Sequence, residues 1–377
     1  MVNRDRLVEN FLRLAAINSP SLHEAAVADV IEAQLREIGF ETHRDDAGSK
    51  IGADTGNLIG VLKGDLPDAM PIMFSAHMDT VVPTEGWGYK IEDGVIYSLG
   101  NTILGADDKA GIAAILEAVR IVREQGIQHG DIEILFSISE ETGLCGAGFA
   151  DMSGFKAKCA FVYDMGKPLG CVTVAAPTHN NIKAEIHGRA AHAGANPENG
   201  VNAIVAASSA IARMTLGRID FETTANIGII EGGIARNVVP ELCVVSGEAR
   251  SRNQEKLDAQ TRHMVDTFQN AAEEMGARAD VEVVQSYKGF RLAEDSEVVK
   301  LSVAAAKRAG IDPEFHETGG GSDANVFNLH GFPAAVIGVG YENAHGVDEC
   351  MAIADLEKSA EMALAIIQEA AISRGRH

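Results

Sequence analysis

Apolar residues recur at two spacings along the chain, and the changes between them predict alternating helices and strands. Helical spacing covers Arg4–Ala16, runs from near His23 to Ile38 and begins again at Asp108. Short apolar runs predict strands at Asn57–Lys63, Met70–Ala76 and Asp131–Ile138. Helices that alternate with short apolar strands are typical of an α/β layer fold with a largely parallel central sheet.

The pattern changes between about Thr178 and Gly289. A strand and a helix are followed there by two adjacent strands, a long helix and another strand, which predicts a compact α+β unit inserted in the chain. Helical patterns at Val298–Ala309 and Leu356–Glu369 and an apolar strand at Pro333–Gly338 then resume the first arrangement. We therefore expect a discontinuous domain, residues 1–178 with 290–377, and an inserted domain, residues 179–289.

The composition is that of a folded and strongly acidic protein. Hydrophobic residues make up 46% and charged residues 23% of the 377 positions, which is ordinary globular usage and argues against disorder. The 32 basic and 54 acidic residues give a formal charge of −22. Such a charge argues against nucleic acid as the main partner and favours a small or cationic one.

The cysteines and the apolar segments indicate the cellular location of the protein. The cysteines are odd in number and contain no C-x-x-C, so neither a disulfide framework nor a thiolate zinc site is predicted: Cys145, Cys159, Cys171, Cys243 and Cys350. The first twenty residues do not read as a secretory signal, and no apolar stretch approaches the roughly 18 residues of a membrane span. We expect a cytoplasmic protein that does not interact with membranes.

Polar side chains with metal-ligand chemistry follow the predicted strands, where open α/β sheets place their ligands. These strand-end residues are His77 and Asp79, Asp107 and Asp108, Glu140 and Glu141, Asp164, and His345 after the last apolar strand. Each alone is an ordinary turn, helix cap or solvated pair, but independent surface loops rarely all carry such groups. Two histidines with several carboxylates suit zinc, cobalt or manganese.

The spacing of these residues suggests which of them bind metal, which orient a ligand and which accept a proton. In His77-x-Asp79 both side chains point the same way, so the Asp79 carboxylate can accept the second ring N–H of His77. The adjacent side chains of Glu140 and Glu141 diverge, so one can bind metal while the other accepts a proton from water. Hydrolysis with two metals also needs a bridging carboxylate, for which we choose Asp107.

Two other enzyme classes find little support in the sequence. No G-x-S-x-G occurs, and Ser75, just before the metal-type histidine, has no separate base. No G-x-G-x-x-G follows a predicted strand, which argues against a dinucleotide enzyme.

The motifs are similar to those of the dinuclear zinc exopeptidase family that includes peptidase T, carboxypeptidase G and aminoacylases. The similar segments run in order over nearly the whole chain: SAHMDTV, GADDKAG, SEETGLCGAG, YDMG, HGRAAHAG, GGIARNVVP, GGGSDANVF and ENAHGVDE. GADDKAG and the His-Met-Asp-Thr run favour the peptidase T branch. The resemblance implies a zinc-exopeptidase catalytic domain and an inserted lid and dimerisation domain.

Carried over by position, the resemblance also implies the roles of the strand-end residues. The implied metal ligands are His77, Asp107, Glu141, Asp164 and His345, which would hold two zinc ions, with cobalt or manganese as substitutes. Glu140 would be the general base and Asp79 would orient His77, and both count as catalytic residues. The Asp107-Asp108 peptide would be cis.

The resemblance places substrate-binding residues in and near the inserted domain. They are His192, Asn237, Arg250, Gly321 and Ser322. His192 lies among small residues that let a substrate approach, and Arg250 has the planar fork that suits a carboxylate. The backbone N–H groups around Gly321 and Ser322 would lie near the ligand. The helix at Val201–Met214 is apolar around much of its circumference, which fits either a homodimer contact or the cover of its own sheet.

The implied activity is tripeptide aminopeptidase, acting on short peptides with a water activated at the metals. Release of the C-terminal residue by a carboxypeptidase, or cleavage of N-acyl amino acids by an amidohydrolase, stays open because the same metals and base would serve any amide. A metal or peptide-binding protein without catalysis is an alternative from another class, and the presence of Glu140 beside Glu141 argues against it.

Overall fold

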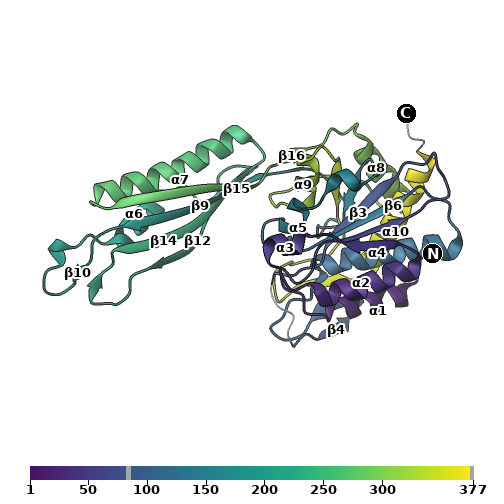
Figure 1. Cartoon of the computed structure of the whole chain (residues 1–377), viewed down its shortest axis with the longest axis horizontal. Coiled ribbons are helices and arrows are strands. Elements are labelled where there is room, and N and C mark those ends of the chain that lie inside the picture. The colour runs from purple at the N-terminus through teal and green to yellow at the C-terminus, as the bar shows by residue number, and fades with distance from the viewer. Residues whose placement is uncertain (82–85, 374–377) are drawn as a thin grey trace. The chain divides into compact units, whose positions relative to one another are not determined.

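The computed structural model describes residues 1–81 and 86–373, which form two compact units (Figure 1). The first unit comprises Met1–Val174, Arg291–Glu317 and Ser322–His377, and the second comprises Ala175–Phe290 with Thr318–Gly321. The predicted domain boundaries at 178 and 289 lie close to these points. The grouping of Thr318–Gly321 with the inserted unit was not expected, because the sequence placed this segment in the first domain.

The sheet of the first unit has a parallel centre and antiparallel edges. Its strands follow the order β1-β2-β6-β3-β7-β18-β8-β16, and β17 pairs with β8. The four parallel strands at the centre are β6 (Ile132–Ser137), β3 (Ile72–His77), β7 (Ala160–Val162) and β18 (Ala334–Ile337). The remaining strands are β1 (Glu41–Arg44), β2 (Leu58–Leu62), β8 (Val172–Ala176), β16 (Phe290–Arg291) and β17 (Phe315–Glu317). The predicted α/β class with a mainly parallel sheet is confirmed.

The central strands are buried on both faces, which explains why they read as continuous apolar runs. Every residue of β3 and of β6 is buried. An alternating strand would have one face in water, whereas a parallel strand between two helical layers has none. The apolar runs predicted in the sequence therefore fall on the right strands, although β3 begins two residues later than the predicted Met70 and ends on His77 itself.

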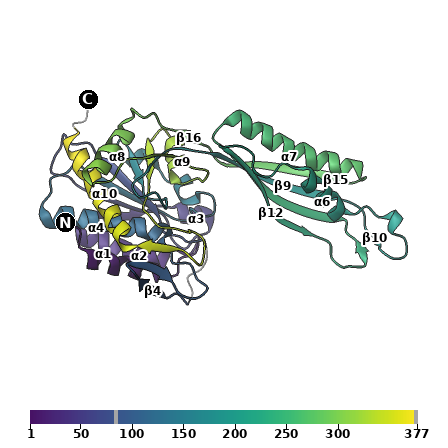
Figure 2. The ribbon, with the colours of Figure 1, turned by 180° about the vertical axis from the view of Figure 1, so that it is seen from behind.

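Long helices cover the sheet of the first unit (Figure 1, Figure 2). The helices are α1 (Arg4–Ala15), α2 (Ala25–Ile38), α3 (Ala47–Ile51), α4 (Ala106–Gln125), α5 (Cys145–Gly148), α8 (Glu297–Arg308), α9 (Asp323–Leu329) and α10 (Ile353–Ile372), with a 3-10 turn η1 at Met152–Gly154. The apolar stripe of α4 is buried, as its spacing predicts. The regular part of α4 begins after Asp108, because Asp107 and Asp108 have non-helical backbone angles.

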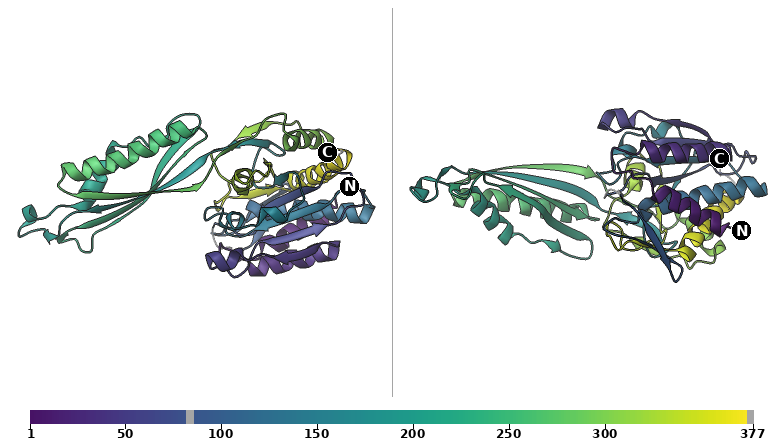
Figure 3. Two further views of the ribbon diagram at one scale, coloured as in Figure 1. Left: turned by 45° about the horizontal axis from the view of Figure 1, so that its top comes forward. Right: turned by 90° about the horizontal axis from the view of Figure 1, so that it is seen from below.

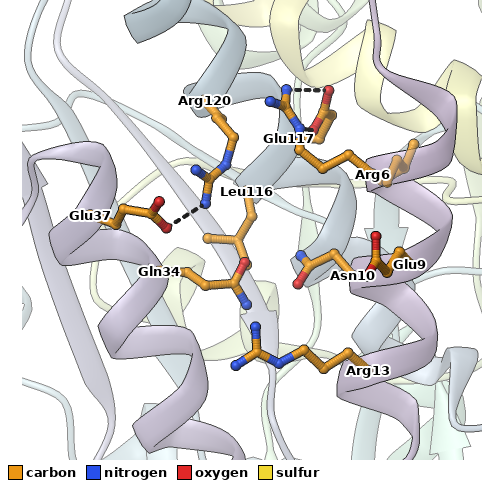
Figure 4. A pocket seen from close by; sticks show the side chains of 10 residues that line it. Arg6, Glu9, Asn10, Arg13, Gln34, Glu37, Leu116, Glu117 and Arg120 are labelled. Atoms are coloured by element: carbon orange, nitrogen blue, oxygen red, sulfur yellow. Dashed lines mark hydrogen bonds and ion pairs between the residues drawn. The ribbon is translucent and has the colours of Figure 1, made fainter.

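Ion pairs join the polar faces of α1, α2 and α4 at the surface. The guanidinium of Arg6 on α1 binds Glu117 of α4, and Arg120 of α4 donates to Glu37 of α2 at 3.2 Å (Figure 4). Glu117 is 4% exposed, so its pair with Arg6 also neutralises a nearly buried carboxylate. These contacts fix the two N-terminal helices against α4.

A small antiparallel sheet in the first unit was not predicted. It has the order β19-β5-β4, with β4 at Tyr89–Glu92, β5 at Val95–Ser98 and β19 at Cys350–Ala352. The hairpin strands are short and largely polar or exposed, so they lack a clear period of two. The third strand comes from a distant part of the chain, which local patterns cannot reveal.

The second unit is an antiparallel sheet with helices on it (Figure 3). Its strand order is β11-β12-β14-β9-β15, with β9 at Thr178–His187, β11 at Gly217–Arg218, β12 at Thr223–Gly232, β14 at Leu242–Ser251 and β15 at Arg278–Tyr287. A separate pair joins β10 (Ala191–His192) to β13 (Val238–Val239), and a 3-10 turn η2 lies at Pro197–Asn199. The helices are α6 (Ala203–Arg213) and α7 (Gln254–Glu274), which pack on β14 and β9. The predicted α+β insertion is confirmed.

The apolar helix α6 covers its own sheet with one face only. Ala203, Ala206, Ala207 and Ala210 are buried in the core of the second unit. Val205 on another face is 46% exposed. Packing against its own sheet therefore accounts for the small residues of this helix but not for the exposed Val205.

None of the described helices is both long enough and apolar enough to cross a membrane.

The contact between α4 and the end of β7 generates a stability prediction. A Cβ at Gly111 would lie 2.5 Å from Oδ1 of Asp108 and closer still to the carbonyl oxygen of Tyr163, which follows β7. We expect Gly111→Ala to lower the free energy of unfolding by about 1–3 kcal/mol, because neither fixed neighbour can yield cheaply. Urea unfolding measures this, with Gly154→Ala as the control because a Cβ there meets nothing within 4 Å. Equal stability of the two variants would contradict the close packing.

Candidate metal centre

The sheet brings the predicted strand-end side chains to one edge. His77 is the last residue of β3, Glu140 and Glu141 follow β6, and Asp164 follows β7. The carboxyl ends of these parallel strands lie side by side, so their side chains meet. Asp107 joins them from the irregular start of α4, beside a cis peptide to Asp108 that confirms the expectation from the family resemblance.

The first group of ligand atoms lies around His77. Its Nε2 is 3.1 Å from Oδ1 of Asp107 and 3.7 Å from Oδ1 of Asp164. Within the described chain, one ligand atom from each of these three residues lies within 4.8 Å of the others. One imidazole nitrogen and two carboxylate oxygens at such distances can converge on one cation.

The second group lies around His345 and shares Asp107 with the first. Nε2 of His345 is 3.3 Å from Oδ2 of Asp107 and 3.0 Å from Oε1 of Glu141. Asp107 therefore turns one oxygen toward each histidine. A carboxylate placed in this way can bridge two metal ions, as we expected of Asp107 from the sequence.

Glu140 stands outside both groups that contain Asp107. It forms a third group with His77 and Glu141, is 8% exposed, and receives no side-chain hydrogen bond that is seen among the described residues. Burial raises the pKa of the Glu140 carboxyl well above its usual range, and the nearby charge of Asp164 adds to the effect. As far as the structure describes the chain, this carboxylate therefore accepts no hydrogen bond from another side chain while it lies within the ligand cluster.

The chemistry of the cluster fits two divalent cations. Burial raises the pKa of Asp164 and of Asp108 well above normal, and neighbouring carboxylates contribute to both shifts. The hydrogen bonds that His345 donates to Asp107 and then to Glu141 raise its pKa to about 10. So many buried carboxylates gathered around two histidines repel one another unless cations neutralise them, and Oδ1 of Asp108 is left buried without a partner.

Asp79 organises both sides of this cluster. Nδ1 of His77 lies 3.0 Å from the backbone carbonyl oxygen of Asp79 and 3.4 Å from its Oδ1, so the carbonyl is the nearer acceptor. The carboxylate of Asp79 accepts the backbone N–H groups of Glu140 at 3.0 Å and Glu141 at 3.2 Å. The residue therefore holds the turn that carries Glu140 and Glu141 as well as the ring of His77.

Two residues behind Asp79 were missed in the sequence. The Ser21 hydroxyl donates to Oδ2 of Asp79 at 2.6 Å, and the buried Glu24 accepts the backbone N–H of Ser139 at 2.9 Å. Ser21 and Glu24 form an S-x-x-E pattern just before α2, which reads as a helix cap. A helix-cap pattern is local, so it gives no indication of the long-range contacts that these two residues make with Asp79 and Ser139.

His192 and Asn237 lie together in the second unit, on neighbouring segments. His192 pairs with Val238, the residue after Asn237, and the backbone N–H of Ala193 donates to the carbonyl of Asn237 at 3.0 Å. Nδ1 of the exposed His192 accepts the backbone N–H groups of Gly194 and Ala195, both at 3.1 Å. In neutral His192 these bonds place the ring proton on Nε2, which can then donate to a ligand.

Arg250, also in the second unit, already holds an internal carboxylate. Its Nε and Nη2 donate to the two oxygens of Glu248 at 3.1 and 2.9 Å, and its Nη1 donates to the Tyr287 hydroxyl at 3.3 Å. His179 and then Arg250 hold the pKa of Glu248 down to about 2. One edge of the guanidinium fork is thus occupied, which the sequence did not indicate.

Gly321 and Ser322 have structural partners of their own. A Cβ at Gly321 would lie within about 2.5 Å of the Tyr287 ring and hydroxyl, so only glycine fits there. The backbone N–H of Ser322 donates to Oδ1 of Asn325 at the start of α9, and the N–H of Gly320 donates to Thr318 Oγ1. Ligand binding by the backbone of this segment stays a prediction.

Comparison with known proteins identifies the family of this chain. The model of peptidase family M20/M25/M40 matches residues 73–369. The solved structure of the aminopeptidase PepT from Bacillus cereus ATCC 10987 is 44% identical, with a TM-score of 0.87 over 98% of this chain and 99% of that one. A solved tripeptidase from Staphylococcus aureus is 38% identical, with a TM-score of 0.93 over 99% and 100%. The YqjE protein of Bacillus subtilis strain 168 is 45% identical over 98% of this chain and its own whole length. The chain belongs to peptidase family M20/M25/M40.

Proposed function

We propose that this chain is a cytoplasmic metal-dependent aminopeptidase that removes the N-terminal residue from tripeptides. The observation that carries the proposal is the carboxylate of Asp107, which turns one oxygen to His77 and the other to His345 while Glu140 stands free beside them. Similarity to the Bacillus aminopeptidase and the Staphylococcus tripeptidase supports the class of substrate.

Two zinc ions would be held by the two groups that share Asp107. His77, Asp107 and Asp164 would bind one ion, and Asp107, Glu141 and His345 the other, with cobalt or manganese as substitutes. Such ions, when bound, act as Lewis acids on a carbonyl and make water acidic enough to lose a proton near neutral pH. The mixed histidine and carboxylate donors fit this use better than they fit calcium or magnesium.

Glu140 would move the proton in the reaction. Its carboxylate would accept a proton from the attacking water and then deliver it to the nitrogen of the leaving amine. Asp79 supports this role because its carboxylate fixes the backbone N–H groups of both Glu140 and Glu141. Adjacent side chains held in this way point apart, so Glu141 is available to metal while Glu140 is not tied to it.

The second unit would supply contacts to the substrate. The Nε2–H of His192 would donate to the carbonyl oxygen as negative charge develops on it, and Asn237 lies on the segment beside it. Arg250 would present to a substrate carboxylate a planar guanidinium whose orientation Glu248 fixes. Gly321 and Ser322 would lie near the same end of the substrate.

We also propose that the protein is a homodimer that pairs through its second unit. Exposed apolar residues on that unit support this, namely Val205 on α6, Ile229 and Ile230 on β12, and Val284 on β15. A two-fold dimer is the commonest symmetric oligomer.

The first test asks which bond is cleaved. With zinc restored to chelated protein, a free tripeptide should lose its N-terminal residue, a C-terminal amide of it should still be cleaved, and an N-acetylated one should resist cleavage. An aminopeptidase needs the free amino group, whereas a carboxypeptidase needs the free carboxylate. Mass spectrometry of the products decides between them. Release of the C-terminal residue, or cleavage confined to N-acyl amino acids, would replace this proposal by the carboxypeptidase or amidohydrolase alternative.

The second test separates proton transfer from metal binding. Glu140→Gln should lower kcat by about 10²–10⁴ while keeping both metals, because only the general base is lost. Glu141→Gln should also lower the metal content, because a ligand is lost. Elemental analysis after gel filtration measures the metals. Equal loss of metal from the two variants would show that the roles of Glu140 and Glu141 are wrongly divided.

The third test concerns the place of His192 in a dimer. If His192 acts on the site of the partner subunit, inactive His192→Ala and Glu140→Gln proteins should regain activity when their subunits exchange, because one of the two hybrid sites has both groups intact. If it acts within its own chain, each chain of the hybrid lacks one group. Absence of recovery in hybrids purified through two different tags rules out the role across the dimer.

A further inference from the structure

Three residues of one loop contact Asp107 at different polar groups. The loop connects β18 to β19 and carries Tyr341, His345 and Glu349. The Tyr341 hydroxyl donates to Oδ1 of Asp107 at 3.0 Å, and Nε2 of His345 lies 3.3 Å from its Oδ2. Oε1 of Glu349 accepts the backbone N–H of Asp107 at 2.9 Å. The loop therefore fixes the carboxylate and the main chain of the same residue.

Glu349 is built into the interior and has no free oxygen for an ion. The residue is 0% exposed, and its Oε2 accepts the backbone N–H of Gly105 at 2.7 Å. With one carboxylate oxygen on Gly105 and the other on Asp107, the side chain spans the irregular turn that begins α4. Both contacts are made to the main chain at the start of α4, so the effect of Glu349 on the ligand groups passes through Asp107.

The rest of the loop needs such an anchor. Its base is closed by two backbone hydrogen bonds between Glu342 and Cys350. Asn343 and His345 adopt φ angles of 58° and 68°, in the left-handed region that favours glycine, so the contacts of the loop must hold them there. The His345 side chain is 52% exposed, and its Nε2 contacts Asp107 and Glu141.

The two ligand groups differ in their dependence on this loop. In the first group, His77 ends a buried central strand and is held by Asp79, and Asp164 follows another central strand. In the second group, His345 comes from the loop itself. Asp107 serves both groups, but only the second also needs the loop to lie in place.

We infer that Glu349 is a positioning residue that fastens the His345 loop to Asp107 and thereby secures the metal ion bound by Asp107, Glu141 and His345 more than the ion bound by His77, Asp107 and Asp164. The inference rests on the proposed two-metal function. Residues that orient metal ligands typically change metal affinity by about 10- to 100-fold when they are replaced.

Titration of metal-free protein with Zn²⁺ in a calorimeter, and with Co²⁺ followed by visible absorption, tests the inference without recourse to activity. Glu349→Gln keeps the size of the side chain but turns an N–H₂ group toward one of the two backbone donors. We expect it to bind the first ion with unchanged affinity and the second about 10- to 100-fold more weakly. Glu342→Gln is the matched control, because Glu342 lies in the same loop, is exposed and pairs with Lys167. It should bind both ions as the wild type does.

Two results for Glu349→Gln would overturn the inference. An unchanged affinity for the second ion would show that the contact does not position the loop. Equally weakened affinity for both ions would show a general structural role. If Glu349→Gln does not fold, Glu349→Asp keeps the charge but reaches only one backbone N–H, and it must show the same selective loss. Binding of fewer than two ions by the wild type would instead remove the two-metal proposal itself.

Discussion

The first unit depends on a concentration of buried negative charge at the carboxyl ends of its central strands. Glu140, Asp164, Asp107 and Asp108 all lie there, and His77 and His345 are the basic neighbours seen to contact this group among residues 1–81 and 86–373. Burial favours the neutral form of each carboxyl, and each charge opposes ionisation of the next. Bound cations would neutralise the repulsion between these carboxylates. The burial of so many acidic groups at one place therefore favours metal binding.

Each of the buried acids that support this cluster accepts two backbone N–H groups. Asp79 accepts from Glu140 and Glu141, Glu24 from Leu22 and Ser139, and Glu349 from Gly105 and Asp107. Backbone donors stabilise the ionised carboxylate without adding a mobile positive charge that would compete for the cluster. Lys109 is fully buried nearby, but its Nζ donates to the carbonyl of Ile17 and burial lowers its pKa to about 7. The negative charge of the site is thereby left for metal ions.

Sequence patterns could predict the residues at the carboxyl edge of the sheet, but not the buried residues that hold them in position. Continuous apolar runs mark β3 and β6 because both faces of these strands are buried, and the polar residues that end each run follow directly. Ser21, Glu24 and Glu349 gave no such signal, because their partners lie far away in the chain and their local context reads as a cap or a loop. The sheet formed by β4, β5 and β19 was missed for the same reason. Periodicity reports which face of an element is buried, whereas these contacts depend on which elements meet.

Arg250 shows that the type of a residue does not reveal which partners its side chain already holds. A guanidinium has two edges that can each hold a carboxylate in a bidentate manner, and Glu248 occupies the edge formed by Nε and Nη2. His179 contacts the same carboxylate at 3.0 Å, so Glu248 is fixed from two sides. The guanidinium of Arg250 therefore has a fixed orientation and a partly neutralised charge. Because the internal carboxylate of Glu248 reduces the attraction of this group for any other anion, geometry weighs more than charge in its contacts.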